Sequence, residues 1–401
     1  MSDPTATLPL EGIRILDVGT RIAAPFAATL LADFGAEVWK IELPGTGDFL
    51  RQIGPFDGEH SLFWAVEGRN KKSVTLDLRK PRGQELFRRM VPLADVIVEN
   101  FQPGTLEGWG LGYAELERLN PGVVLTRATV YGQAGPYRDR PGLDRNGIAM
   151  GGLLYLTGFR DRPPVRPGIL VSDYLTGVFN ALSIMIALHE RGRSGRGQVV
   201  DLALYESVLR LLEHTIASHD RLGIVREREG NRLANSAPLD TWETKDGKFL
   251  SIVAAGDVLF PRLARAIGRD DLPADPRFRT LRDRVRHADE INGIVADWCR
   301  AHDSAEIEEI MLAAQVPVCR AYSVADIAAD PHVAARGDLE TVEDPVLGKV
   351  RMQGVYPRLS RTPGAIRRGA PRLGEHDDEI YRGALGLADA EIEALRREGV
   401  I

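Results

Sequence analysis

Cysteine is scarce in this 401-residue sequence, which contains only Cys299 and Cys319 and no CxxC motif. Two unpatterned cysteines cannot form the disulfide framework of a small secreted protein, nor the usual thiolate zinc site. A reducing compartment is therefore expected. Both thiols are predicted to be buried as small apolar side chains.

The common signatures of nucleotide, metal and serine-hydrolase sites are also missing. No GxxxxGK(S/T) is present, no GxGxxG follows the first predicted strand, and no serine lies in GxSxG. The eight histidines show no HExxH or related spacing. P-loop, dinucleotide-binding, zinc-protease and nucleophile-elbow chemistry are therefore unsupported, and no metal ligand is predicted.

Excess positive charge and a long uninterrupted apolar run are absent as well, and we expect no signal peptide. The net charge is −6, which argues against a general nucleic-acid binder. The first residues, MSDPTATLPLEG, lack a charged segment followed by an apolar one, and Asn180 and Ser183 interrupt the longest apolar run. We expect a cytoplasmic protein with neither nucleic acid nor membrane as partner.

Alternating strand and helix patterns dominate the first half of the chain. Strands are predicted at 13–19, 37–42, 72–78, 95–101, 123–132 and from 199, with helices at 24–36, from Pro81 and at 113–120. Such alternation indicates βαβ units and a parallel sheet. Ligands of these sheets bind at the carboxyl ends of the strands, which directs attention to 19–21, 40–42, 100–101 and 131–135.

A different pattern follows a polar stretch at 226–238. Residues 239–255 read as a hairpin turning at Asp246–Gly247, and helical segments then continue to about 328. The length of the chain favours two domains. We predict a large α/β domain at 1–220, a smaller α+β domain with linkers at 221–330, and a segment at 331–401 that returns to the large domain.

One carboxylate, Asp173, stands at the head of an apolar run of helical length, VSDYLTGVFNALSIMIALHE. An aspartate at this place is usually an N-cap, because its oxygen accepts free N–H groups of the first turn. It could equally be a nucleophile, since a helix N-terminus favours the ionised carboxylate. Gly177, one turn later, either leaves open space beside Asp173 or serves packing.

Several blocks of this sequence resemble class III CoA-transferases, the family of formyl-CoA transferase and carnitine CoA-transferase, which also includes α-methylacyl-CoA racemases. The matching blocks include LEGIRILDVG, AAPFAATLLADFGAEVWKIE, GRNKKSVTLDL, ADVIVENFQPGTLEGWGLGY, YGQAGPY, RSGRGQVVDLALYESVL and APRLGEHDDEIY. The resemblance is collinear from about residue 9 to 401. It implies a large Rossmann-like parallel-sheet domain, a smaller α+β domain and an interlocked homodimer.

The resemblance also implies that Asp173 is the catalytic nucleophile. A carboxylate can exchange CoA between two acids through an acid anhydride and an aspartyl-CoA thioester. CoA thioesters would then be substrates, with no tightly bound cofactor. Backbone N–H groups are expected to stabilise the oxyanions. Residues 253–257 match a mobile glycine loop of some members, but Gly256 is their single glycine, so a lid there is doubtful.

CoA contacts carry over by position. The expected contacts are Arg21, Ile22 and Ala23 near the thioester, Lys40 near the nucleotide, Leu76 and Leu78 beside adenine, and Asn100 and Phe101 along the pantetheine. Lys71 and Lys72 could offer charge to the phosphates, although exposed surface lysines are the commoner case. One member uses an arginine for CoA where this chain has Gly108.

Leu143 separates transferase from racemase, because racemase members carry a histidine there and leucine cannot shuttle a proton. The blocks look nearest to members that move CoA from succinyl-CoA to malate or citramalate. Arg21 is the first candidate for a distal carboxylate, with Arg145 and Arg69 as further possibilities, and Asp144 matches an acidic position near the nucleophile. A racemase, a formyl-CoA and oxalate transferase, a monocarboxylate acceptor and a non-catalytic CoA binder remain alternatives.

Overall fold

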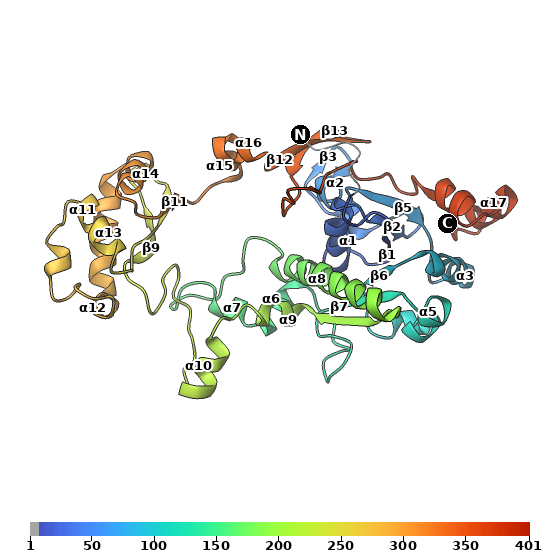
Figure 1. Ribbon diagram of the computed structural model, residues 1–401, viewed down its shortest axis with the longest axis horizontal. Coiled ribbons are helices and arrows are strands. Elements are labelled where there is room, and N and C mark those ends of the chain that lie inside the picture. Colours follow the sequence, from blue (N-terminus) through green and yellow to red (C-terminus); the bar gives the residue numbers. More distant parts are fainter. Residues whose placement is uncertain (1–7) are drawn as a thin grey trace. The chain divides into compact units, whose positions relative to one another are not determined.

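The structure is a computed structural model, and it describes residues 8–401. The chain forms two compact units, shown as a ribbon in Figure 1. The larger unit takes the described chain up to Leu154, Pro167–Ala217 and Ala334–Ile401, and the smaller takes Tyr155–Arg166 and Ser218–Val333. The sequence ranges put Tyr155–Arg166 in the large domain, whereas here it packs with the smaller unit: Tyr155 binds Glu227, for example.

A six-stranded parallel sheet organises the larger unit, in the order β5-β2-β1-β6-β7-β8. Its strands are β1 (Arg14–Asp17), β2 (Glu37–Glu42), β5 (Lys71–Thr75), β6 (Val96–Glu99), β7 (Val124–Thr129) and β8 (Val199–Ala203). The predicted α/β class and parallel sheet are confirmed. The strand order reverses between β1 and β6, and at such a point the two strand ends leave a crevice for a ligand.

Helices cover both faces of the sheet, as Figure 1 shows. Those of the larger unit are α1 (Ala23–Asp33), α2 (Leu62–Glu67), α3 (Pro81–Met90), α4 (Thr105–Gly108), α5 (Tyr113–Leu119), α6 (Asp144–Met150), α8 (Val171–Ser194), α9 (Leu204–Leu209) and α17 (Asp389–Arg397). Three helices contain the points along the chain where one unit ends and the other begins: α7 (Leu153–Leu156), α10 (Thr215–Leu222) and α16 (Pro331–Arg336).

The strands are apolar on both faces, as strands of a covered parallel sheet must be. In β1, Ile15 belongs to the core that α1 and α8 share with the sheet, and Leu16 belongs to the opposite core with α3, α5 and α17. Both side chains are fully buried. This alternation follows from the two-residue period of a strand, and it leaves the loops at the strand ends free to build a site.

The smaller unit contains a three-stranded antiparallel sheet, in the order β11-β10-β9. Its strands are β9 (Leu239–Glu243), β10 (Phe249–Val253) and β11 (Val318–Arg320), and its helices are α11 (Leu259–Ala266), α12 (Leu281–Arg286), α13 (Ala288–Ala301), α14 (Ser304–Ala313) and α15 (Val324–Ala329). The predicted hairpin over 239–255 is confirmed, with Gly247 supplying the positive φ of 70° at its turn. The predicted α+β character is confirmed with it.

The C-terminal segment is bound to the edge of the large sheet. The hydroxyl of Tyr381 donates to the backbone oxygen of Thr75 at 2.6 Å, and the N–H of Asp77 donates to the oxygen of Val400 at 2.8 Å. The antiparallel hairpin of β12 (Leu339–Asp344) and β13 (Gly348–Gln353) also belongs to the larger unit. Residues far apart in sequence thus complete one core.

Two sequence expectations fail at this level. Cys299 is buried, but Cys319 is exposed on the short edge strand β11. The sequence also predicted no stretch of membrane-spanning length, yet α8 is long and apolar enough by length and composition alone. In the structure α8 packs on α1, α6 and α9 within the larger unit.

Candidate active site

Asp173 lies in the first turn of α8, but it does not cap that helix. The N-cap residue is Leu170, so Asp173 is the third helical residue. The cap comes from Asp144 at the start of α6: its Oδ1 accepts the N–H of Ser172 at 2.8 Å and, more weakly, the N–H of Asp173 at 3.3 Å. The N-cap interpretation of Asp173 is therefore wrong, because a residue 29 positions earlier fills that role.

The surroundings of the Asp173 carboxylate disfavour its ionised form. Burial raises its pKa to about 7, the negative charge of Asp144 acts in the same direction, and the Arg21 guanidinium opposes both. No hydrogen bond from residues 8–401, the part the structure describes, contributes to this balance. A desolvated carboxylate without hydrogen-bond donors is a stronger nucleophile than one in water.

A cavity of about 140 Å³ opens at Asp173, and it collects most of the residues expected near the thioester. Arg21, Ile22, Ala23, Asn100, Phe101 and Leu143 all line it together with Asp173. They come from the loops that follow β1, β6 and β7 and from α8. The cavity thus lies at the reversal of strand order, where the topology predicts a ligand.

The loops after β1 and β6 are joined by the side chain of Asn100. Its Oδ1 accepts the N–H of Thr20 at 2.8 Å, and its Nδ2 donates to the oxygen of Thr20 at 2.7 Å. Both ends of the amide are therefore occupied in shaping the crevice. Phe101 lines the cavity beside Asn100 and adds apolar surface to it.

Arg21 occupies an uncommon backbone conformation, with a φ of 65°. Its N–H donates to Oδ1 of Asp48 at 3.1 Å, and its guanidinium lies 4.0 Å from the ring centroid of Phe49. A non-glycine residue with positive φ costs free energy and tends to occur at functional positions. Arg21 makes no ion pair with a described carboxylate, so its charge remains available in the cavity.

Lys40 was expected near the nucleotide, and the structure buries it instead. It is 1% exposed, its Nζ lies 2.8 Å from Oδ2 of Asp48, and it also donates to the oxygen of Gly19. Opposite charges compensate the desolvation and raise its pKa. Lys40 therefore acts on the Arg21 turn through Asp48, and it does not line the cavity at Asp173.

Lys71 and Lys72 also differ from the surface lysines that are commoner at such positions. Lys71 is 1% exposed and pairs with Asp17 at 2.9 Å. Lys72 is partly exposed and pairs with Glu37 and Glu379. Both ammonium groups are thus already neutralised by carboxylates, which leaves them poorly suited to bind phosphates.

A second cavity, of about 310 Å³, adjoins the first, because Thr20 and Phe101 line both. Leu76 and Leu78, expected beside adenine, line it together with Trp109. The rings of Phe101 and Trp109 meet edge to face at 5.2 Å. This apolar wall and the Asp173 cavity form a continuous path along the carboxyl edge of the sheet.

Three other candidates lie away from the Asp173 cavity. Arg145 is exposed on α6 and does not line it. Arg69 is 6% exposed and pairs with Asp33 at 2.6 Å. Asp144 is 4% exposed and faces the backbone of α8. None of these three side chains lines the cavity at Asp173, and a role for them as substrate ligands stays a prediction.

Sequence reasoning missed Arg138, Arg140 and Arg79. The first two line the Asp173 cavity, with Arg140 stacked 3.5 Å from the ring centroid of Tyr137. Arg79 lines the second cavity, and its side chain is 62% exposed although it binds Asp77. A signal existed for each: the basic pair in PYRDRP follows β7, and Arg79 directly follows Leu78.

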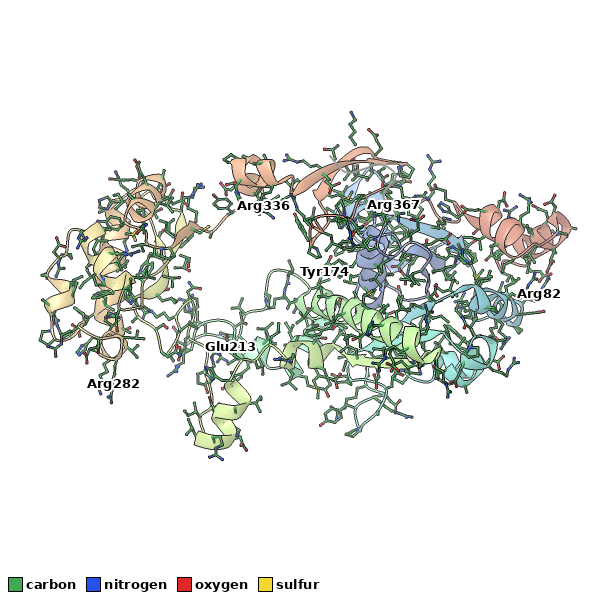
Figure 2. The ribbon with its side chains drawn as sticks, viewed as in Figure 1. Arg82, Tyr174, Glu213, Arg282, Arg336 and Arg367 are labelled. Atoms are coloured by element: carbon green, nitrogen blue, oxygen red, sulfur yellow. The ribbon has the colours of Figure 1, made fainter. Side chains whose placement is uncertain are left out.

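Gly177 serves packing and leaves no space beside Asp173. A Cβ at this position would lie 2.7 Å from Cδ1 of Phe26 and 3.2 Å from the oxygen of Ala23. It therefore sets the close approach of α1 and α8. Tyr174, labelled in Figure 2, extends the contact, with its ring edge to face against Phe26 at 4.8 Å and its hydroxyl donating to Glu67 at 2.8 Å.

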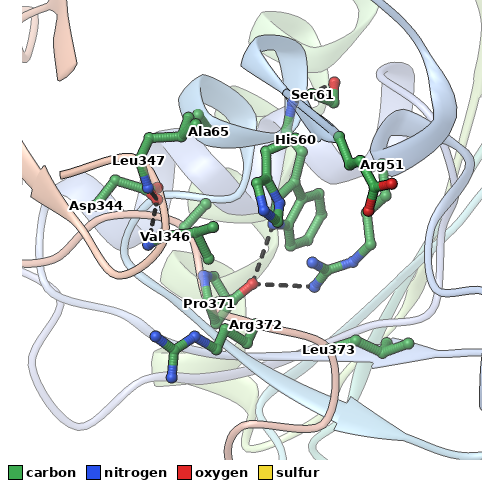
Figure 3. Close-up of a pocket in the computed structure, with 13 residues that line it drawn as sticks. Arg51, His60, Ser61, Ala65, Asp344, Val346, Leu347, Pro371, Arg372 and Leu373 are labelled. Atoms are coloured by element: carbon green, nitrogen blue, oxygen red, sulfur yellow. Dashed lines mark hydrogen bonds between the residues drawn. The ribbon is translucent and has the colours of Figure 1, made fainter. Parts of the chain in front are cut away.

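A further cavity of about 260 Å³ lies between α2 and the C-terminal segment (Figure 3). Several of its polar groups are paired within the protein: Arg51 binds Glu42, and both Arg51 and Trp64 donate to the oxygen of Pro371. Asp344 likewise accepts the N–H groups of Val346 and Leu347. With these groups occupied, this cavity is a weaker candidate than the one at Asp173.

No group of three or more histidine, cysteine, aspartate or glutamate side chains among the described residues is placed to hold a metal ion. Within the part of the chain that the structure describes, the site combines one carboxylate outside any ion pair, nearby arginines, a helix N-terminus at Ile22–Ala23 and an apolar path. Such a set suits covalent acyl chemistry on a long anionic substrate.

Known proteins are similar to this chain in sequence and in fold. The model of CoA-transferase family III matches residues 10–377. Over its full length the chain is 46% identical to succinyl-CoA–D-citramalate CoA-transferase of Chloroflexus aurantiacus and 44% identical to the beta subunit of succinyl-CoA–L-malate CoA-transferase of that organism, each covered completely.

Solved structures agree. The crystal structure of a CAIB/BAIF family protein from Brucella suis is 32% identical with a TM-score of 0.85, over 94% of this chain and 99% of that chain. Rv3272 from M. tuberculosis, in an orthorhombic form, is 29% identical with a TM-score of 0.81, over 92% of this chain and 98% of that one. The chain belongs to CoA-transferase family III.

Proposed function

We propose that this enzyme transfers CoA from succinyl-CoA to a dicarboxylic acid such as malate or citramalate, with Asp173 as the covalent nucleophile. The observation that carries the proposal is the carboxylate of Asp173 in a cavity that also holds Arg21, neither of them in an ion pair with any residue of 8–401. Relatives named for these substrates, 44–46% identical over the full length, support the choice of donor and acceptor.

The reaction begins when Asp173 attacks the thioester carbonyl of succinyl-CoA. The C–S bond breaks, which gives an aspartyl-succinyl anhydride and a CoA thiolate. The thiolate attacks the aspartyl carbonyl, succinate leaves with the bridging oxygen, and an aspartyl-CoA thioester remains. The acceptor carboxylate then attacks this thioester and expels the thiolate. The thiolate finally attacks the acceptor's carbonyl in the new anhydride, which releases the new thioester and restores the Asp173 carboxylate.

Each tetrahedral intermediate needs hydrogen-bond donors for its oxyanion. The N-terminus of α1 supplies candidates, because the N–H groups of Ile22, Ala23 and Ala24 have no hydrogen-bond partner among the described residues. Ile22 and Ala23 line the Asp173 cavity. The dipole of α1 favours negative charge at this end, so these N–H groups can stabilise the negative charge of the oxyanion.

The path along the sheet edge fits the CoA arm. Leu76, Leu78 and Trp109 offer apolar surface for adenine, and Phe101 lies where the path enters the Asp173 cavity. Arg79 offers a partly exposed charge for a phosphate group. In this proposal Lys40 acts indirectly, through Asp48 and the Arg21 turn.

Arg21 is the proposed partner of the distal carboxylate. Succinate leaves before the acceptor enters, so the two acids occupy one acyl position in turn and a single cation serves both. Arginine suits this task because its planar guanidinium can form two parallel hydrogen bonds to a carboxylate. Stacking on Phe49 leaves the edge of that group free.

A racemase of the same family is the second candidate. It needs two groups to remove and return an α-proton, and Asp173 is the single carboxylate or imidazole among the described residues that line its cavity. Leu143 lines the cavity where racemase members carry histidine. A formyl-CoA and oxalate transferase is the third, and its acceptor is also a dicarboxylate.

We also propose that the protein forms an interlocked homodimer and works in the cytoplasm. An apolar stripe on α8 supports the dimer: Val178, Leu182 and Ile186, at intervals of four residues, are 50%, 54% and 61% exposed. Large exposed apolar side chains on one helix face mark an interface. Light scattering should give twice the chain mass of 44.1 kDa, and a monomer mass for active enzyme would contradict this part.

The experiment is a matrix of acyl-CoA donors against carboxylic acid acceptors, read by mass spectrometry in deuterated buffer. Exchange from succinyl-CoA to malate or citramalate, without deuterium at the α-carbon, is the expected result. Deuterium uptake without exchange would identify a racemase. Formyl-CoA and oxalate as the best pair would select the third candidate, and no exchange with any pair would contradict the proposal.

A further inference from the structure

We propose that Asp144 is a positioning residue for Asp173: from α6 it occupies the free N–H groups at the start of α8, which keeps the Asp173 carboxylate out of a capping role and available for attack. This inference rests on the proposed function of Asp173 as nucleophile. It assigns Asp144 a part in the reaction although Asp144 does not line the cavity.

The contacts of Asp144 account for the start of α8. Its Oδ1 accepts the N–H of Ser172 at 2.8 Å and of Asp173 at 3.3 Å. The N–H of Val171 donates to Ile169, and the N–H of Tyr174 donates to Leu170. The first four N–H groups are therefore all used, and none remains to bind the carboxylate of Asp173.

Asp173 is the third residue of α8, so its own carboxylate could bind these N–H groups if Asp144 did not. A carboxylate there commonly reaches back to an N–H at the helix start, as in a capping box. Donors left open by the loss of Asp144 would attract the nearest carboxylate, which is Asp173 itself. A carboxylate bound to N–H groups has a lowered pKa and is a weaker nucleophile. An aspartate on another helix removes that competition.

The junction between α6 and α8 is built to hold Asp144 in place. Ser172 is fully buried, and its hydroxyl lies 2.9 Å from both the backbone oxygen and Oδ1 of Asp144. A Cβ at Gly147 would lie 2.7 Å from the Ser172 hydroxyl oxygen. Asn146 fixes the start of α6, because its Oδ1 accepts the N–H of Leu143 at 3.0 Å. A carboxylate so confined cannot turn toward the cavity.

The charge of Asp144 adds an electrostatic effect to the geometric one. The charged groups around Asp173 are Asp144 on α6 and Arg21 before α1, with Arg138 and Arg140 on the cavity wall and Glu67 bound to the neighbouring Tyr174. Of these, Asp144 raises the pKa of Asp173. A neutral residue there should therefore let Asp173 ionise at lower pH and make it a less basic nucleophile.

The test compares wild type with Asp144→Asn, which can still accept the N–H of Ser172 but has no charge. We measure kcat/KM for succinyl-CoA from pH 5 to 9. The midpoint of the acid limb should fall by about 1 pH unit, the lower end of what a neighbouring charge does, and the plateau should fall about 3- to 10-fold. Asp57→Asn, at an exposed aspartate of the two-residue strand β3 (Phe56–Asp57), is the control for charge and should leave the profile unchanged.

Ser172→Ala provides a second variant, because it removes one contact to Asp144 and leaves its charge. A severalfold lower kcat with an unchanged midpoint is expected. An unmoved midpoint in folded Asp144→Asn would overturn the inference, and so would wild-type kcat in Ser172→Ala if Asp144→Asn does not fold.

A wild type inactive with every donor would instead overturn the proposed function. The pH dependence of melting then tests Asp144 separately, since Asp144→Asn should lose less stability than wild type between pH 5 and 8. An equal loss in the two proteins would overturn the inference.

Discussion

Asp173 carries a charge that the fold does little to stabilise. Its pKa of about 7 reflects burial and the neighbouring Asp144, with Arg21 as the opposing charge. A carboxylate of this kind is half protonated near neutral pH, so its ionised form has a high free energy. Formation of an anhydride removes that charge, and the unfavourable ground state thus favours the first covalent step.

The same property predicts how stability depends on pH. Folding raises the pKa of Asp173 from 3.8 to about 7. The contribution of Asp173 to the free energy of unfolding is therefore complete below pH 4 and is lost as the pH rises through about 7. Asp173→Asn should match wild type in melting near pH 4 and exceed it at pH 8 by about 1 to 3 kcal/mol, a range reduced for the open side of the cavity. A constant difference across this pH range would contradict the raised pKa.

Arg21 provides a test of substrate selection. Asparagine tolerates the positive φ at position 21, so Arg21→Asn removes the charge with little backbone strain. At pH 9, kcat/KM should fall about 100-fold for a dicarboxylic acceptor, the loss of a charged hydrogen-bonded pair. A monocarboxylate of equal length should change less than about 3-fold by the same estimate, and Arg21→Lys should recover part of the loss. Equal losses for both acceptors would reject this role.

Residues that line the crevice could be predicted from the sequence, whereas those buried behind it could not. Asp173, Ile22 and Phe101 follow strand ends or begin a helix, so their place is readable from the chain. Lys40 also ends a strand, but its side chain points into a buried ion pair with Asp48. Asp144 acts on a helix 29 residues away, and no local pattern reports such a contact.

Among the elements, α1 and α8 matter most, because their N-termini carry the proposed oxyanion donors and the nucleophile. Their separation is set at Gly177, where a Cβ would meet Phe26 at 2.7 Å. The strands of the sheet were predictable from alternating patterns, since short apolar runs between helices have few other interpretations. The reversal of strand order between β1 and β6 was not, because it depends on which strands pair.

A pair of glycine substitutions in α8 tests this arrangement. Gly177→Ala should destabilise the larger unit by about 1 to 3 kcal/mol through overpacking, and kcat should fall about 10-fold or more as Asp173 shifts. Gly192→Ala, in the same helix with open space around it, should be neutral or stabilising by about 0.5 kcal/mol. Thermal melting and steady-state kinetics measure both effects. Similar results for the two variants would show that the spacing of α1 and α8 is not limiting.

At the scale of the whole molecule, the larger unit contains the nucleophile, the apolar path and the C-terminal segment that closes the sheet edge. The exposed stripe on α8 belongs to it as well. The proposed interlocked homodimer has no signature in composition or periodicity, which is why its prediction came from the family resemblance. The acids that are exchanged depend on a few side chains around Asp173, and composition is equally silent about them.

Whether Asp173 is the covalent nucleophile is tested directly by the mass of the enzyme mixed with succinyl-CoA in the absence of an acceptor. We expect a CoA adduct that maps to Asp173, that hydroxylamine converts to an aspartyl hydroxamate, and that disappears when malate or citramalate is added. Asp173→Asn should show neither adduct nor turnover. Active wild-type enzyme with no modification at Asp173, or turnover retained by Asp173→Asn, would show that Asp173 is not the nucleophile.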